Sequence, residues 1–83
     1  MGIVTKRRVY EHNGHEIVVY AGWIDHYLQI NGQIVDRVKT AVGISLELKG
    51  EINGVSVRSN IGMGLFGNHV VTFINGVEAE AEK

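Results

Sequence analysis

The sequence predicts an all-β protein, an antiparallel β-sandwich or flattened barrel of seven or eight short strands built from two hairpin-rich halves. Asn-Gly occurs four times between apolar or alternating segments, at 13–14, 31–32, 53–54 and 75–76. This pair suits the type I′ hairpin turn, in which both central residues need a positive φ. No segment repeats apolar residues at helical spacing over two turns. Hairpins therefore account for most of the chain.

The first half of the chain supplies strands on either side of two Asn-Gly turns. Its segments are, in chain order, 9–12, 15–20, 26–30 and 33–36. Residues 36–42 would fit one helical turn, but a crossover between the two halves explains them as well. We expect two antiparallel hairpins here.

The second half repeats this pattern. Its segments are 44–49, 55–58, 68–74 and 77–82. In the first of them, strict alternation places Ile44, Leu46 and Leu48 on one face. The last one alternates too, but its Ala and Glu are poor strand formers, so we expect its end to fray.

The spacing indicates an internal repeat within one β domain that spans residues 1–83. The two copies cover about 3–38 and 44–81, with Ile30-Asn31-Gly32 and Ile74-Asn75-Gly76 as matching landmarks. Apolar faces of short antiparallel strands pack against one another in sandwiches and barrels. The predicted core residues are Ile17, Val19, Leu28, Ile30, Ile34, Leu46, Leu48, Val55, Val57, Val71 and Phe73.

Composition narrows the class of protein. The chain has 83 residues, 45% hydrophobic and 20% charged, which is ordinary for one globular domain. No apolar run approaches the about 20 residues of a membrane span, and the N-terminal residues lack the pattern of a secretory signal. The absence of Cys excludes disulfides and thiolate ligands. We therefore expect a cytoplasmic protein without a membrane partner.

The glycine-rich segment 62–67 spells G-x-G-x-x-G. A dinucleotide-binding loop with this spacing must open a helix, whereas residues 68–74 have the pattern of a strand. We expect a hairpin loop and no cofactor. Leu65 and Phe66 then either cap the core or contact a partner protein. Trp23 is interpreted as a lid on the core, with a contact to a ligand or partner as the alternative.

A basic N-terminal segment raises the possibility of nucleic-acid binding. Small β-barrels bind single strands through basic and aromatic side chains on strand faces. The candidates here are Lys6, Arg7, Arg8, Tyr10 and Arg58. A net charge of −1 argues against this function, and Lys or Arg at an edge strand also prevents sheets from pairing with one another.

Four histidines, His12, His15, His26 and His69, suggest a metal site less strongly. They lack the H-E-x-x-H spacing and any Cys partner. Asp25 and His26 with a serine (Ser45, Ser56 or Ser59) would make a hydrolytic triad, but no nucleophile elbow accompanies them. We predict no catalytic residue and no bound metal, and leave histidine metal binding as a lesser alternative.

The order of turn and core signals resembles a group of small uncharacterised bacterial all-β proteins. The segments that carry this resemblance are 10–17, 28–32, 46–54, 62–67 and 70–76. A fainter likeness is to the β-sandwich domains of the Fas apoptotic inhibitory molecule, which also have paired hairpins with Asp-Gly or Asn-Gly turns. Both resemblances imply a β architecture, and neither implies a catalytic residue.

Our leading hypothesis is a non-catalytic protein that binds a protein partner or associates with itself as a homo-oligomer. A nucleic-acid-binding small β-barrel is the alternative.

Overall fold

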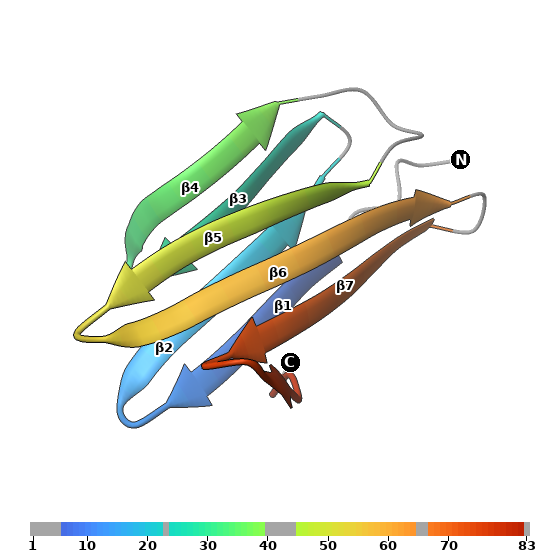
Figure 1. Ribbon diagram of the computed structural model, residues 1–83. Coiled ribbons are helices and arrows are strands. Elements are labelled where there is room, and N and C mark those ends of the chain that lie inside the picture. The colour runs from blue at the N-terminus through green and yellow to red at the C-terminus, as the bar shows by residue number, and fades with distance from the viewer. Residues whose placement is uncertain (1–5, 23, 40–44, 65–66, 83) are drawn as a thin grey trace.

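The computed structural model contains eight strands in two four-stranded antiparallel sheets (Figure 1). It describes residues 6–22, 24–39, 45–64 and 67–82, with the backbone alone for 63, 64, 67 and 68. The strands are β1 (Lys6–His12), β2 (His15–Ala21), β3 (Asp25–Ile30), β4 (Gln33–Lys39), β5 (Leu46–Ile52), β6 (Val55–Gly64), β7 (Gly67–Ile74) and β8 (Val77–Ala79). Sheet 1 has the order β1-β2-β3-β4, and sheet 2 the order β5-β6-β7-β8.

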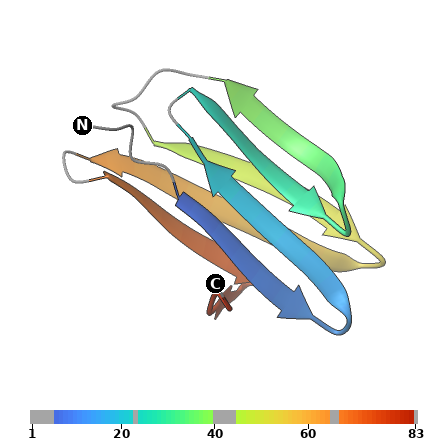
Figure 2. The same cartoon turned by 180° about the vertical axis from the view of Figure 1, so that it is seen from behind.

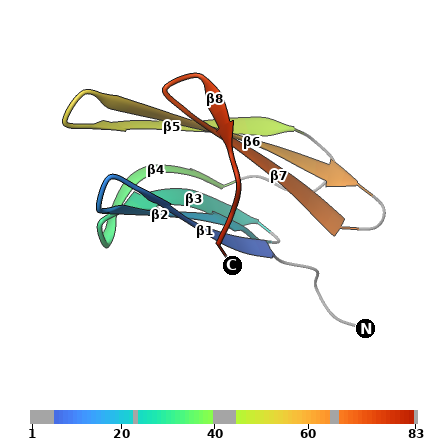
Figure 3. The ribbon, with the colours of Figure 1, turned by 90° about the horizontal axis from the view of Figure 1, so that it is seen from below.

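The two sheets form separate layers (Figure 3). The predicted all-β class is thus confirmed, and of its two forms the fold is a sandwich and not a closed barrel. The first half of the sequence makes sheet 1 and the second half makes sheet 2. The described residues include no helix with the length and apolarity that a membrane span requires.

All four Asn-Gly pairs have the predicted turn conformation. The φ angles of the asparagines lie between 49° and 53°, and those of the glycines between 79° and 82°. Asn31 and Asn75 make the same two hydrogen bonds in their respective sheets. The backbone N–H of each donates to the carbonyl of Glu16 or Ser56 at 2.8 Å, and its side-chain oxygen accepts the N–H of that residue at 3.0 Å. The two sheets therefore share one hairpin framework.

The core lies between the sheets and contains most of the predicted residues. Its buried members are Tyr10, Ile17, Val19, Ala21, Leu28, Ile30, Leu48, Val57, Ile61 and Ile74, with Leu46 and Val55 partly buried against them. Three predicted core residues are instead on outer faces. Ile34 and Val71 are 42% and 37% exposed, and Phe73 lies opposite Arg58. Val71 and Phe73 belong to a continuous apolar run, in which alternation does not identify the inner face.

The turn register explains the error at Ile34, because Ile30 pairs with Gln33 and the outward-facing Gln29 pairs with Ile34. Beyond this pair, a β-bulge shifts the register between Leu28 and Gln29, so that Asp36 pairs with the buried Leu28. An extra residue in one strand moves the side chains beyond it to the other face. Asp36 is thereby turned toward sheet 2, where its carboxylate accepts the N–H of Lys49 in β5 at 2.8 Å. This bond ties the β4 edge of sheet 1 to the β5 edge of sheet 2.

The opposite flank is closed by the C-terminal segment. The N–H of Glu82 donates to the carbonyl of Val9 in β1 at 2.6 Å. Figure 3 shows this segment leaving β8 of sheet 2 and reaching sheet 1. β8 ends at Ala79, before the end of the predicted segment 77–82, and Glu82 finds a backbone partner at the edge of β1.

Candidate functional site

Figure 2 has the outer face of sheet 1 turned toward the viewer. A row of aromatic and basic side chains crosses the strands on this face. Arg7 in β1 pairs with Tyr20 in β2, Tyr20 pairs with Tyr27 in β3, and Tyr27 pairs with Arg37 in β4. Residues directly opposite one another in neighbouring strands project from the same face. We call Arg7, Tyr20, Tyr27 and Arg37 the aromatic row.

Three side chains of this row, those of Tyr20, Tyr27 and Arg37, are in direct contact. The Tyr20 and Tyr27 rings stack with their centroids 5.1 Å apart and an angle of 24° between the ring planes. The Arg37 guanidinium lies 5.5 Å from the Tyr27 centroid. Two Arg37 nitrogens also donate to the Asp25 carboxylate at 3.0 and 3.1 Å. Tyr27 is thus held between a second ring and a cation.

Gly22 leaves the space that the Tyr20 ring occupies. A Cβ atom at this position would lie 2.6 Å from Tyr20 Cε2 and 2.7 Å from the Asp25 carbonyl oxygen. The N–H of Gly22 donates to that same carbonyl at 3.1 Å. A larger residue would therefore displace the ring or open the β2–β3 turn.

Two further rows lie on the outer face of sheet 1, and Asp25 pairs with Lys39 beyond the aromatic row. The central row consists of Val9, Val18, Gln29 and Ile34, which are paired across β1 to β4. Val9 and Val18 are buried although they face outward, and their neighbours on this face have longer side chains. The acidic row consists of Glu11 and Glu16, which are paired across β1 and β2.

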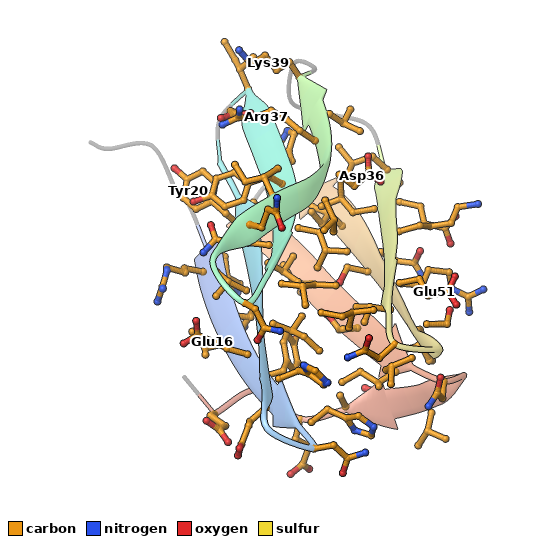
Figure 4. The ribbon with its side chains drawn as sticks, turned by 90° about the vertical axis from the view of Figure 1, so that its left-hand side faces the viewer. Glu16, Tyr20, Asp36, Arg37, Lys39 and Glu51 are labelled. Carbon is orange, nitrogen blue, oxygen red and sulfur yellow. The ribbon has the colours of Figure 1, made fainter. Side chains whose placement is uncertain are left out.

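The charge of this face changes sign along the strands. Figure 4 shows Glu16 toward one end of sheet 1 and Arg37 and Lys39 toward the other. The basic end has three cations and one carboxylate, that of Asp25, and the acidic end has two carboxylates. No ion pair in the described ranges involves the other four charged side chains of this face, Arg7, Lys39, Glu11 and Glu16. Their charges are therefore open to an external partner.

The outer face of sheet 2 has a charged centre instead. Lys49, Arg58, Phe73 and Glu78 are paired across its strands. Glu47 forms ion pairs with Lys49 at 3.6 Å and with Arg58 at 3.3 Å, and Arg58 lies 5.2 Å from the Phe73 centroid. An open groove of about 290 Å³ runs beside these residues. Its cations are already paired within the chain, which weakens it as a site for an anion.

The predicted nucleic-acid residues do not form one surface. Tyr10 is only 2% exposed and belongs to the core, so its ring is closed to a base. Arg7 projects from the outer face of sheet 1, whereas Arg58 projects from that of sheet 2, on the other side of the molecule. Lys6 and Arg8 alternate with Arg7 along β1, the edge strand of sheet 1, and therefore project from the same face as Tyr10. Charged side chains in this position protect an edge strand from pairing.

The histidines are dispersed. His12 and His15 pair across the first turn, His26 is fully buried at the other end of sheet 1, and His69 lies in β7. No group of three His, Cys, Asp or Glu within the described residues could hold a metal ion.

The residues of the hypothetical triad do not meet either. Asp25 is bound to Arg37, while the neighbouring residue His26 points to the opposite face, as consecutive strand residues do. Neither ring nitrogen of His26 has a hydrogen-bond partner among the described residues. Ser59 shares a buried hydrogen bond of 2.8 Å with Thr72 in sheet 2.

The predicted partner-binding residues Leu65, Phe66 and Trp23 lie outside the described residues, so their role stays a prediction. The glycine-rich segment around the first two joins strand to strand, since Gly64 of β6 pairs with Gly67 of β7. This agrees with the expected hairpin and differs from the strand–loop–helix of a dinucleotide site.

The sequence reasoning missed the aromatic row. Its signal is weak, because Tyr20 and Tyr27 each look like an ordinary residue of a strand. The sequence predicts that Tyr20 pairs with Tyr27 only if Ala21 and His26 are known to be the first partners beside the β2–β3 turn. Comparison of the chain with protein-family models, with curated proteins and with solved structures finds no match.

Proposed function

We propose that this chain is a non-catalytic protein-interaction domain and that the outer face of sheet 1 is its contact surface. The observation that carries the proposal is the aromatic row. Protein interfaces are enriched in Tyr and Arg, and buried Tyr and Arg side chains contribute much of their binding energy. On this face, two tyrosines and two arginines form one continuous row beside apolar and uncharged residues.

The arrangement of the rings favours a protein partner over a nucleic acid. Stacking with a base requires an open ring face, but the two faces of Tyr27 are occupied by Tyr20 and Arg37. The ring edges and hydroxyl groups remain for contact. A tyrosine held in this way contributes contact area with little further loss of conformational entropy.

Two pieces of this proposal rest on the sequence alone. The absence of Cys supports a cytoplasmic location. The similar number of acidic and basic residues supports a partner that is neither nucleic acid nor an anionic membrane.

A photo-reactive phenylalanine analogue at two matched positions tests the contact surface. Tyr27 and Val71 follow equivalent hairpins in the two sheets, and each pairs with its neighbour on an outer face. In cells that express the tagged chain, we expect illumination to give protein adducts from position 27 and few from position 71. Equal yields from the two positions, or adducts that contain nucleic acid, would overturn the proposal.

An oligonucleotide titration tests the alternative function. We expect no change in light scattering or elution when a mixed oligonucleotide is added at low salt. Binding that weakens steeply as salt rises is the signature of contacts to phosphates, and this result would replace the proposed function with nucleic-acid binding.

A further inference from the structure

We infer that the outer face of sheet 1 binds a second copy of this chain, as a face-to-face dimer whose two-fold axis runs along the central row. The inference rests on the proposed function, because it names the partner of the same face. It follows from the way in which charged and uncharged residues are distributed about that row.

The residues of β1 and β2 on this face are self-complementary about the central row. In β1, Arg7 and Glu11 stand two residues before and two residues after Val9. In β2, Tyr20 and Glu16 stand at the same distance on either side of Val18. A two-fold axis through the central row reverses the strand direction of the second copy while keeping β1 over β1. Each Arg7 then lies over a Glu11 of the other copy.

The remaining contacts agree with this axis. Tyr20 of one copy lies over Glu16 of the other, where its hydroxyl can donate to the carboxylate. Ile34, which is 42% exposed, lies near the axis and meets its own symmetry mate. An isologous interface requires such a self-complementary patch. Uncharged residues along the axis and charged residues beside it also match the usual core and rim of an interface.

Other orientations of the two faces are less favourable. An axis parallel to the strands, through the middle of the sheet, would exchange β1 with β4 and so place Arg7 of one copy over Arg37 of the other. Like charges facing one another across an interface suppress an association. The outer face of sheet 2 offers less, because Lys49 and Arg58 are already paired with Glu47.

The size of the face indicates a weak dimer. Four strands about 4.8 Å apart, each about seven residues long at about 3.3 Å per residue, cover roughly 440 Å². Two such faces would bury roughly 900 Å², below the about 1,200–2,000 Å² of stable interfaces. We therefore expect dissociation in the range from about 10 μM to about 1 mM, and weaker association at high salt.

Complementary charge reversals test this arrangement by sedimentation equilibrium over that concentration range. Arg7→Glu leaves two contacts between acidic side chains about the axis in β1, and Glu11→Arg leaves two between basic ones. Each variant alone should dimerise at least tenfold more weakly than the wild type. An equimolar mixture should recover the wild-type affinity, because every contact then joins opposite charges. Lys49→Glu, on the outer face of sheet 2, makes the same change in net charge and should leave the dimer unchanged.

Circular dichroism of each variant verifies that it is folded, and Glu11→Lys replaces Glu11→Arg if that variant unfolds. A wild-type chain that stays monomeric to about 1 mM would overturn the inference. So would a dimer that Arg7→Glu does not weaken, or a mixture that does not recover. In these cases protein adducts from position 27 would still support the proposed function, with another protein as the partner.

Discussion

The two sheets of this protein share one framework but present different surfaces. Asn31 and Asn75 occupy equivalent turns. Their hydrogen bonds to Glu16 in β2 and to Ser56 in β6 have equal lengths. The outer faces above these turns differ. At the positions of Arg7, Tyr20 and Tyr27, sheet 2 has Glu47, Asn60 and Val71.

This difference separates what the fold requires from what it leaves free. The hairpin turns need Asn-Gly, and the inner faces need side chains that fill the space between the sheets. The outer faces have no such requirement. Cross-strand aromatic pairs contribute about 0.2–1 kcal/mol to a sheet, and sheet 2 folds without one. The fold therefore does not require the aromatic row.

The inner faces also differ, in a way that makes the halves complementary. Tyr10 of β1 corresponds to Gly50 of β5, so a large side chain in one sheet has no counterpart in the other. A Cβ at Gly50 would lie 2.6 Å from Val35 Cγ2 and 3.2 Å from Leu28 Cδ2. Gly50 of sheet 2 thus leaves room for Val35 and Leu28 of sheet 1.

The largest expected effect comes from removing the side chain that only one sheet has. Tyr10→Ala deletes a ring that is 2% exposed in the core. We expect a loss of about 3–5 kcal/mol in the free energy of unfolding, out of roughly 4–12 kcal/mol for a domain of this length. Urea unfolding measures it, and a loss below about 1 kcal/mol would show that Tyr10 is not a core residue.

The next effect concerns a buried pair that is polar in one sheet and apolar in the other. Ser59 and Thr72 share a hydrogen bond of 2.8 Å, where sheet 1 has Val19 paired with Leu28. Ser59→Ala or Thr72→Val alone leaves one hydroxyl unsatisfied, which costs about 1–3 kcal/mol. Together they should cost less than the sum of the single changes, by at least about 1 kcal/mol. Additive losses in thermal or urea unfolding would contradict this account.

The shared framework predicts similar losses at its two matched turns. Asn31→Ala and Asn75→Ala each remove a side-chain acceptor and place Ala at a positive φ, so each should cost about 1–2 kcal/mol. Asn53→Ala is the matched control. It has a φ of 49° but no side-chain hydrogen bond among the described residues, and should cost less. Asn31 Nδ2 also donates to His15 Nδ1 at 3.0 Å in an exposed hydrogen bond, so the loss at 31 should be slightly larger. Losses that differ by more than about 1 kcal/mol would mean that the halves are not equivalent.

The smallest effect is expected at the surface ion pairs. Arg37 binds Asp25 with two hydrogen bonds, and Arg58 binds Glu47 at 3.3 Å, with side chains 45% and 49% exposed. Water and salt screen such pairs, so Arg37→Ala and Arg58→Ala should each cost about 1 kcal/mol or less. Urea unfolding at low and at high salt concentration measures these losses in the free energy of unfolding. A loss above about 2 kcal/mol would assign these arginines a role in stability.

Much of the fold follows from local sequence signals, and the candidate site does not. Asn-Gly and alternation predict the hairpins because each depends on a few neighbouring residues. The core prediction at Ile34 is wrong because Ile34 and Val35 are both apolar, so that alternation does not identify the inner face there. The prediction that Tyr10 contacts nucleic acid at the surface is wrong because Val9 and Tyr10 are neighbours, and both are apolar enough to face either the core or the solvent. The aromatic row depends on how β1 pairs with β2, β2 with β3, and β3 with β4, and no local sequence signal specifies all three registers.

Two-dimensional ¹H–¹⁵N spectra recorded during dilution test the central claim most directly. If the dimer forms through the outer face of sheet 1, the amide signals of its three rows shift together as the protein is diluted. These rows include residues from Arg7 to Glu11 in β1 and from Glu16 to Tyr20 in β2. Signals of β5 to β8 should stay in place. Shifts concentrated in sheet 2, or spectra that do not change with concentration, would contradict a dimer that forms through the outer face of sheet 1.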